Sequence, residues 1–170
     1  MLDDALALAE VTGELQRLAP VRVARAEAAW LAGDLGRAAD EAGRGMELAV
    51  LRENRWRSGE LALWLHRAGP ASLISANVAE PYALELGGDW AAAAPMWDGL
   101  GFPIQAARSR SEAGDEAAVR VALASFERLG ARPVAARYGG RCGASAAHCP
   151  SVSSRSLIIR QRHNAFEDTT

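Results

Sequence analysis

The residues with the most obvious potential for chemistry are two cysteines and two histidines near the C-terminal end of the sequence. Thiolate and imidazole are the ligands that zinc prefers, so a zinc site is one hypothesis for them. They are Cys142, His148, Cys149 and His163. Their spacing lacks the short CxxC or HxxxH knuckle that preorganises a structural site. We therefore predict no metal site, and two cysteines in the last fifth of the chain build no disulfide framework.

Catalytic signatures are absent from the sequence. The glycine pair around Arg44 lies within a helical pattern and lacks the strand and the lysine of a phosphate-binding loop. There is no GxSxG elbow and no HExxH helix. His66, between Leu65 and Arg67, has no neighbour that suggests acid–base work, so a packed or surface histidine is favoured. We predict no catalytic residues, no cofactor and no enzyme.

Two aromatic patterns leave alternatives open. Arg52, Arg55 and Arg57 surround Trp56, which allows nucleic-acid contact but is more typical of a solvated connector. The five tryptophans could line a ligand groove, although large aromatic residues at helical spacing are more often core. They are Trp30, Trp56, Trp64, Trp90 and Trp97.

Composition and charge favour a soluble protein. The chain has 170 residues, 49% hydrophobic and 24% charged, with a formal net charge of -2. That charge gives no electrostatic reason to expect nucleic acid or an anionic membrane as a partner. The N-terminus carries Asp3 and Asp4 where a signal peptide needs positive charge, and no stretch has the roughly 18 apolar residues of a membrane span. We predict a cytoplasmic location, with no membrane and no direct nucleic-acid partner.

A Gly-Asp pair recurs in the chain and indicates helical hairpins. It occurs at residues 33–34, 88–89 and 114–115. Glycine just past a helix end can adopt the left-handed conformation, and aspartate caps the next helix, so the chain can reverse with almost no loop. Gly33 and Gly69 lie 36 residues apart, close to the roughly 34 of a tetratricopeptide unit.

Apolar periodicity then predicts the helices. Pro20 fits the first turn of its helix, residues 52–58 read as a connector, and Gly43 and Gly45 suggest close helix approach. The expected helices are residues 2–10, about 20–32, 35–51, 56–68, 81–86, 90–100, 104–113, 116–129 and 133–137. The first of these helices starts partway along a repeat, which predicts an exposed apolar face, marginal stability or self-association.

The sequence changes character near residue 138. Glycine and serine become frequent and the helical period is lost. We predict two parts: a tetratricopeptide-like helical domain over residues 1–137, and an irregular or disordered tail over residues 138–170 that a shifted reading frame would explain. The fold class is all-α, with antiparallel helix pairs stacked as a short solenoid.

Four blocks of sequence resemble the helical-repeat region of large ATP-binding LuxR-type bacterial transcriptional regulators of the MalT-like class. The blocks are TGELQRLAPVRVARAEAAWLAGD, GELALWLHRAG, EPYALELGGDWAAAA and ALASFERLGARPVAAR, at residues 12–34, 59–69, 80–94 and 122–137. The resemblance implies signal sensing or partner binding through the repeats. The family's ATP-binding domain and helix-turn-helix are not found in this sequence. The resemblance therefore implies neither ATPase activity nor DNA binding for this chain.

These observations leave three functions open. The first is the sensor and interaction region of a LuxR-type regulator. The second is a stand-alone adaptor that binds a protein or peptide. The third is a non-functional gene fragment.

Overall fold

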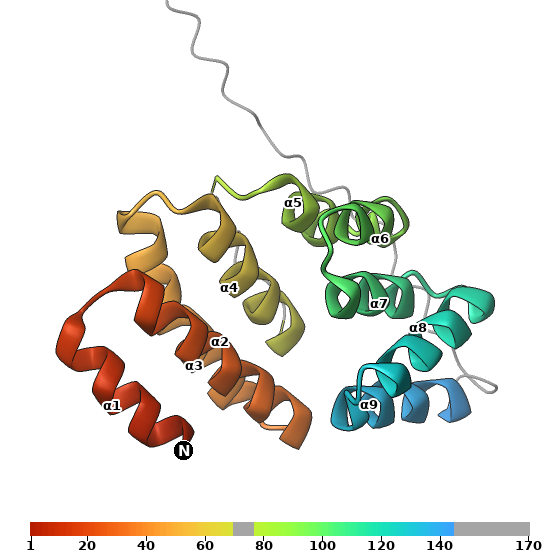
Figure 1. Ribbon diagram of the computed structural model, residues 1–170, viewed down its shortest axis with the longest axis horizontal. Coiled ribbons are helices and arrows are strands. Elements are labelled where there is room, and N and C mark those ends of the chain that lie inside the picture. The colour runs from red at the N-terminus through yellow and green to blue at the C-terminus, as the bar shows by residue number, and fades with distance from the viewer. Residues whose placement is uncertain (70–76, 145–170) are drawn as a thin grey trace, which may run out of the picture.

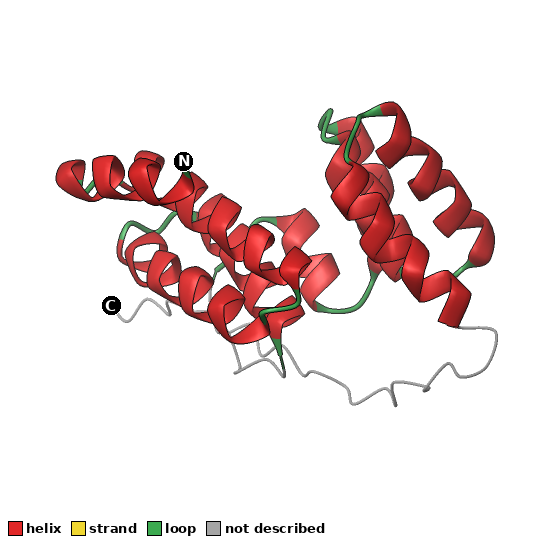
Figure 2. Cartoon of the chain, turned by 90° about the horizontal axis from the view of Figure 1, so that it is seen from below, coloured by secondary structure: helices red, strands yellow, loops and turns green. Residues whose placement is uncertain are grey.

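The computed structural model describes residues 1–69 and 77–144, with side chains up to residue 140. This part of the chain contains only helices and loops (Figure 2). The helices are α1 (Leu2–Thr12), α2 (Leu15–Ala32), α3 (Leu35–Leu51), α4 (Arg55–Ala68), α5 (Glu80–Leu86), α6 (Trp90–Gly99), α7 (Pro103–Glu112), α8 (Glu116–Arg128) and α9 (Arg132–Ala144). The predicted all-α class is confirmed for the described residues.

Neighbouring helices in the sequence pack side by side. Helices α1 to α4 lie on the left of Figure 1 and α6 to α9 on the right, with α5 between them. The most extensive contacts are those of α2 with α3, α3 with α4, α6 with α7 and α7 with α8. Helix α9 also touches α2, although the two lie far apart in the chain. The two groups of helices therefore meet a second time, away from the α4–α5 connection.

The three Gly-Asp turns form as predicted. Gly33 has φ 84° and the Asp34 side chain accepts a hydrogen bond from the Arg37 N–H at 3.0 Å. Gly88 and Gly114 also adopt positive φ, and the aspartates that follow them cap α6 and α8. At each of these turns only two or three residues separate one helix from the next.

One predicted helix start is wrong, and one predicted connector is too long. Pro20 lies inside α2 rather than in its first turn, because the helix already begins at Leu15. Leu15 and Ala19 are buried, so the extra turn is core even though proline removes one helical hydrogen bond. The connector at residues 52–58 is also shorter, since Asn54 accepts a hydrogen bond from the Arg57 N–H and caps α4.

The predicted boundary between residues 137 and 138 is wrong as well. Helix α9 runs from Arg132 to Ala144, across the point where the composition changes. Tyr138 is only 2% exposed, and its ring stacks on Phe126 with 5.7 Å between ring centroids. Tertiary packing therefore outweighs the low helix propensity of the glycines that follow. The proposed tail beyond residue 144, with His148, Cys149 and His163, lies outside the described residues.

The described helices pack around two hydrophobic cores. The larger connects α2, α3, α4, α7, α8 and α9, and the smaller surrounds Trp97 and Tyr82 between α4, α5, α6 and α7. Close approach, expected at Gly43 and Gly45, occurs at Gly45, where an added Cβ would lie 2.8 Å from Leu61 Cδ2. Nothing lies within 4 Å of a Cβ at Gly43.

A network of partly buried ion pairs connects α1, α2 and α3. Arg22 donates to Glu41 at 2.6 Å and to Glu10 at 2.8 Å, and Arg25 donates to Glu41 at 2.7 Å and to Asp3. Burial acts to raise the pKa of Glu41, but the hydrogen bonds from the two arginines outweigh it and the pKa is lowered. Glu41 is therefore held ionised between α2 and α3.

The outer face of α1 is apolar and exposed, as predicted. Leu8 is 73% exposed and Val11 is 87% exposed. Self-association through this face stays a prediction.

Glycines 43 and 59 provide a matched test of helix packing. A Cβ at Gly59 would lie 2.4 Å from Tyr82 Cδ2 and 2.7 Å from Tyr82 Cβ, so Gly59→Ala forces α4 and α5 apart. We expect a loss of about 1–3 kcal/mol in the free energy of unfolding, measured by urea denaturation. Gly43→Ala, also within a helix, should gain up to about 1 kcal/mol because alanine favours the helix. Equal effects of the two substitutions would contradict the close α4–α5 contact.

Candidate ligand-binding pocket

Three buried rings join helices from distant parts of the chain. Trp30 on α2 packs edge-on against Trp64 on α4, with centroids 5.9 Å apart and planes at 66°. Trp30 also meets Tyr138 on α9 at 5.9 Å. All three are at most 5% exposed. We call Trp30, Trp64 and Tyr138 the Trp30 cluster. Its side chains make the contact between α2 and α9.

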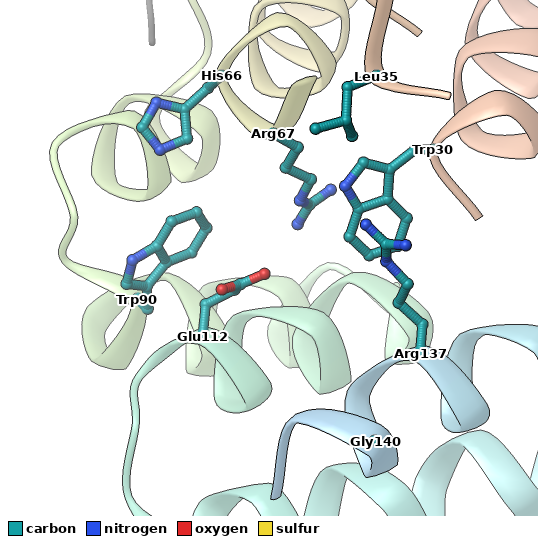
Figure 3. Close-up of a pocket in the computed structure, with 8 residues that line it drawn as sticks. All are labelled: Trp30, Leu35, His66, Arg67, Trp90, Glu112, Arg137 and Gly140. Atoms are coloured by element: carbon teal, nitrogen blue, oxygen red, sulfur yellow. The ribbon is translucent and has the colours of Figure 1, made fainter. Parts of the chain in front are cut away.

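A pocket of about 450 Å³ lies beside the Trp30 cluster (Figure 3). Figure 3 shows that side chains reach it from both groups of helices: Arg67 descends from α4, Arg137 rises from α9, and Trp90 and Glu112 face them. Its lining comprises Trp30, Leu35, His66, Arg67, Trp90, Glu112, Arg137 and Gly140. Concave sites of this volume with a few convergent polar groups are typical ligand-binding sites.

The two arginines of the pocket contact tryptophan rings rather than acids. The guanidinium carbon of Arg137 lies 4.3 Å from the centre of the Trp30 ring, and that of Arg67 lies 5.2 Å from the Trp64 ring. Within the described residues, neither guanidinium has a hydrogen bond or an ion pair. Glu112, the one acid among the described lining residues, accepts a hydrogen bond from the Tyr138 hydroxyl at 2.9 Å. The described residues of the lining therefore carry an excess of positive charge.

His66 forms an uncharged part of the wall. Its ring lies 6.2 Å from that of Trp90, with the planes at 47°. Burial lowers the pKa of His66, the charge of Arg67 lowers it further, and Glu112 opposes both. The imidazole is neutral at pH 7 and contributes a flat surface, not a charge.

A second, much smaller cavity of about 20 Å³ also has Arg67 in its lining. Within the described residues, every buried side-chain nitrogen or oxygen without a hydrogen-bond partner belongs to Arg67, Glu85 or Arg108, and all three residues line this cavity. A cavity of this size can hold one water molecule, and a polar lining is the condition for it.

Glu85 and Arg108 are themselves anchored. Glu85 Oε1 accepts hydrogen bonds from Trp97 Nε1 at 3.1 Å and from the Ser109 hydroxyl, while burial raises the pKa of Glu85 against the attraction of Arg67. Arg108 pairs with Glu27 on α2, and its pKa is lowered by burial. The Arg108–Glu27 pair is a further link between α7 and α2.

The tryptophans divide between the two predicted roles. Trp30, Trp64 and Trp97 are buried core residues, as the favoured alternative predicted. Trp30 and Trp90 also border the pocket, which agrees with the groove alternative. Trp56 is 47% exposed, and its ring meets those of Tyr82 and Trp97.

Two of the three arginines around Trp56 are bound by other groups of the protein. Arg55 donates to the carbonyl of Val78 at 3.0 Å, and Arg57 pairs with Glu60 at 2.6 Å. Cys142 falls on α9, and its side chain is not among those described. The residues that sequence reasoning missed are Arg67, Glu112 and Arg137, because they converge only when α4, α7 and α9 fold together.

The described residues contain neither a candidate metal site nor a helix that could span a membrane. No group of three or more histidine, cysteine, aspartate or glutamate side chains there could hold a metal ion. None of the helices in this part of the chain combines the length and the apolar character that a bilayer crossing requires.

Comparison with known proteins yields no relationship. No family model, no curated protein and no solved structure shows a significant match to the chain. The function must therefore be inferred from the pocket itself.

The environment of His66 predicts its titration. Because burial and Arg67 disfavour the imidazolium, we expect its pKa to lie below 6.5 in the folded protein. The unfolded chain then binds more protons, so this histidine reduces stability as the pH falls from 6.5 through the folded-state pKa. NMR titration of the ring C–H signals measures this, and His66→Gln identifies the signal. A midpoint at or above 6.5 would show that the ring is not buried against Trp90.

Proposed function

We propose that this chain is a ligand-sensing helical module whose binding site is the pocket beside the Trp30 cluster. One observation carries the proposal: a single cavity of about 450 Å³ is lined by residues from six helices and from both groups of helices. A molecule bound there contacts both groups at once. Its binding energy therefore favours the arrangement in which α2 and α9 touch.

The resemblance to LuxR-type regulators supports the same function. In those proteins the helical region senses a signal or binds a partner, and here we propose the same role for tetratricopeptide-like helix pairs in the cytoplasm. The short Gly-Asp turns and the side-by-side packing of successive helices support this arrangement. The α2–α9 contact goes beyond a stack in which each pair touches only its neighbours.

A second candidate function is that of an adaptor for a protein or peptide. It is favoured by an open hollow of about 750 Å³ on a different surface, between the start of α4, the start of α5 and the end of α6. Trp56 and Leu100, 47% and 46% exposed, lie there with Met96. Exposed aromatic and apolar side chains of this kind are typical of protein interfaces.

Two tryptophan substitutions separate the functions. We expect a screen of small metabolites and short peptides by thermal unfolding to find compounds that raise the Tm of the wild type. Such compounds should lose their effect on Trp90→Ala, which opens the pocket, and keep it on Trp56→Ala, which alters the other surface. A ligand concentration 100 times its Kd should add about 2.7 kcal/mol of stability.

The opposite pattern contradicts the sensing function. If stabilising compounds act on Trp90→Ala as on the wild type but fail on Trp56→Ala, the hollow around Trp56 is the binding site. The adaptor function would then be the better one.

A further inference from the structure

We propose that the pocket beside the Trp30 cluster recognises a carboxylate attached to a flat apolar body, with Arg67 and Arg137 as its two binding groups. The proposal rests on the ligand-sensing function and names the chemical class of the ligand. It follows from the unpaired guanidinium groups, from the charge of the lining, and from its aromatic walls.

The guanidinium groups of Arg67 and Arg137 are available for an anion. Most arginines on the inner surfaces of this protein have a carboxylate: Arg22 and Arg25 bind Glu41, and Arg108 binds Glu27. Arg67 and Arg137 have none in the part of the chain whose side chains are described. Nε and Nη2 of Arg67 also lack a hydrogen-bond partner there, and Arg67 borders both the pocket and the small cavity beside Glu85. Buried donors without partners are costly, and the planar fork of arginine matches a carboxylate.

The two guanidinium groups are held in place before any ligand arrives. Arg137 lies over Trp30, Arg67 lies over Trp64, and these two rings touch edge to face. Contact with an aromatic face stabilises a cation without satisfying its N–H groups. Both arginines therefore keep hydrogen-bond donors for a ligand while their positions are fixed by the buried rings.

The charge of the lining selects a single negative charge. Among the lining residues that the structure describes, Arg67 and Arg137 are opposed by Glu112 and His66 is neutral, which leaves one positive charge in excess. A monoanion balances this excess. A phosphate with two negative charges would leave one uncompensated close to Glu112, which is unfavourable in a partly enclosed site.

The remaining walls select a flat apolar body. Trp90 and His66 present adjacent rings on one side, and Trp30 presents its ring on the other (Figure 3). Aromatic rings pack best against other flat groups. A carboxylate bound by Arg67 of α4 and Arg137 of α9 would also connect the two groups of helices directly.

Matched acids and amides test the carboxylate. Indole-3-acetate and 3-phenylpropionate are compared by calorimetric titration with their neutral amides, and the peptide Ala-Ala-Phe is compared with its amidated form to distinguish small acids from peptide C-termini. We expect each acid that binds to do so about tenfold or more tightly than its amide. Phenyl phosphate should bind more weakly than the carboxylates.

Arginine substitutions test which residues bind it. Arg67→Met and Arg137→Met should each remove the preference for acid over amide, whereas Arg120→Met, an exposed arginine on α8, should leave it unchanged. Because Arg67 also borders the small cavity beside Glu85, thermal unfolding is recorded for each variant, and Arg67→Lys serves if Arg67→Met does not fold. Lysine keeps the charge but loses the fork, so it should keep only part of the preference.

The results that overturn the proposal differ from those that overturn the sensing function. Amides binding as tightly as acids, phosphate binding best, or an unchanged preference in Arg137→Met would each refute the carboxylate class. No binding by any acid at millimolar concentration would refute it too. In all of these cases the sensing function still stands or falls on the comparison of Trp90→Ala with Trp56→Ala.

Discussion

The packing of Trp30 against Tyr138 is the contact on which the rest of the structure depends. It brings α9 onto α2, across more than a hundred residues of chain, and so turns two groups of helices into one body with a shared interior. Arg137 is placed over Trp30 by the same turn of α9. Without this contact the pocket would lose one wall and one of its two arginines.

Charge is distributed unevenly around this contact. Near α1, α2 and α3 every buried charge is matched, as in the network around Glu41. Around Trp64, Arg67 has no ion pair with an acid of the described residues, and its charge influences the pKa values of His66, Glu85, Arg108 and Tyr138. Unmatched charge beside an aromatic cluster reduces stability, and it is a feature expected of a binding site rather than of a structural core.

Local structure was predictable from the sequence, but the contact between α2 and α9 was not. Each Gly-Asp turn is a pair of adjacent residues with a known physical role. The starts of α3, α6 and α8 could therefore be located from the sequence. Pro20 and Tyr138 were misplaced because packing decides both positions: a buried first turn tolerates the proline, and buried rings extend α9 past the glycines. The pocket residues share no sequence pattern, since Arg67, Glu112 and Arg137 are far apart in the chain and meet only in the folded protein.

A double-mutant cycle between Trp30→Ala and Tyr138→Ala tests the central contact most directly. The free energies of unfolding of the wild type, the two single variants and the double variant are measured by urea denaturation. If the rings pack as described, the two losses are not additive, and the coupling free energy is about 0.5–1.5 kcal/mol. Additive losses, with a coupling near zero, would show that α9 does not pack on α2 and would contradict the shared pocket.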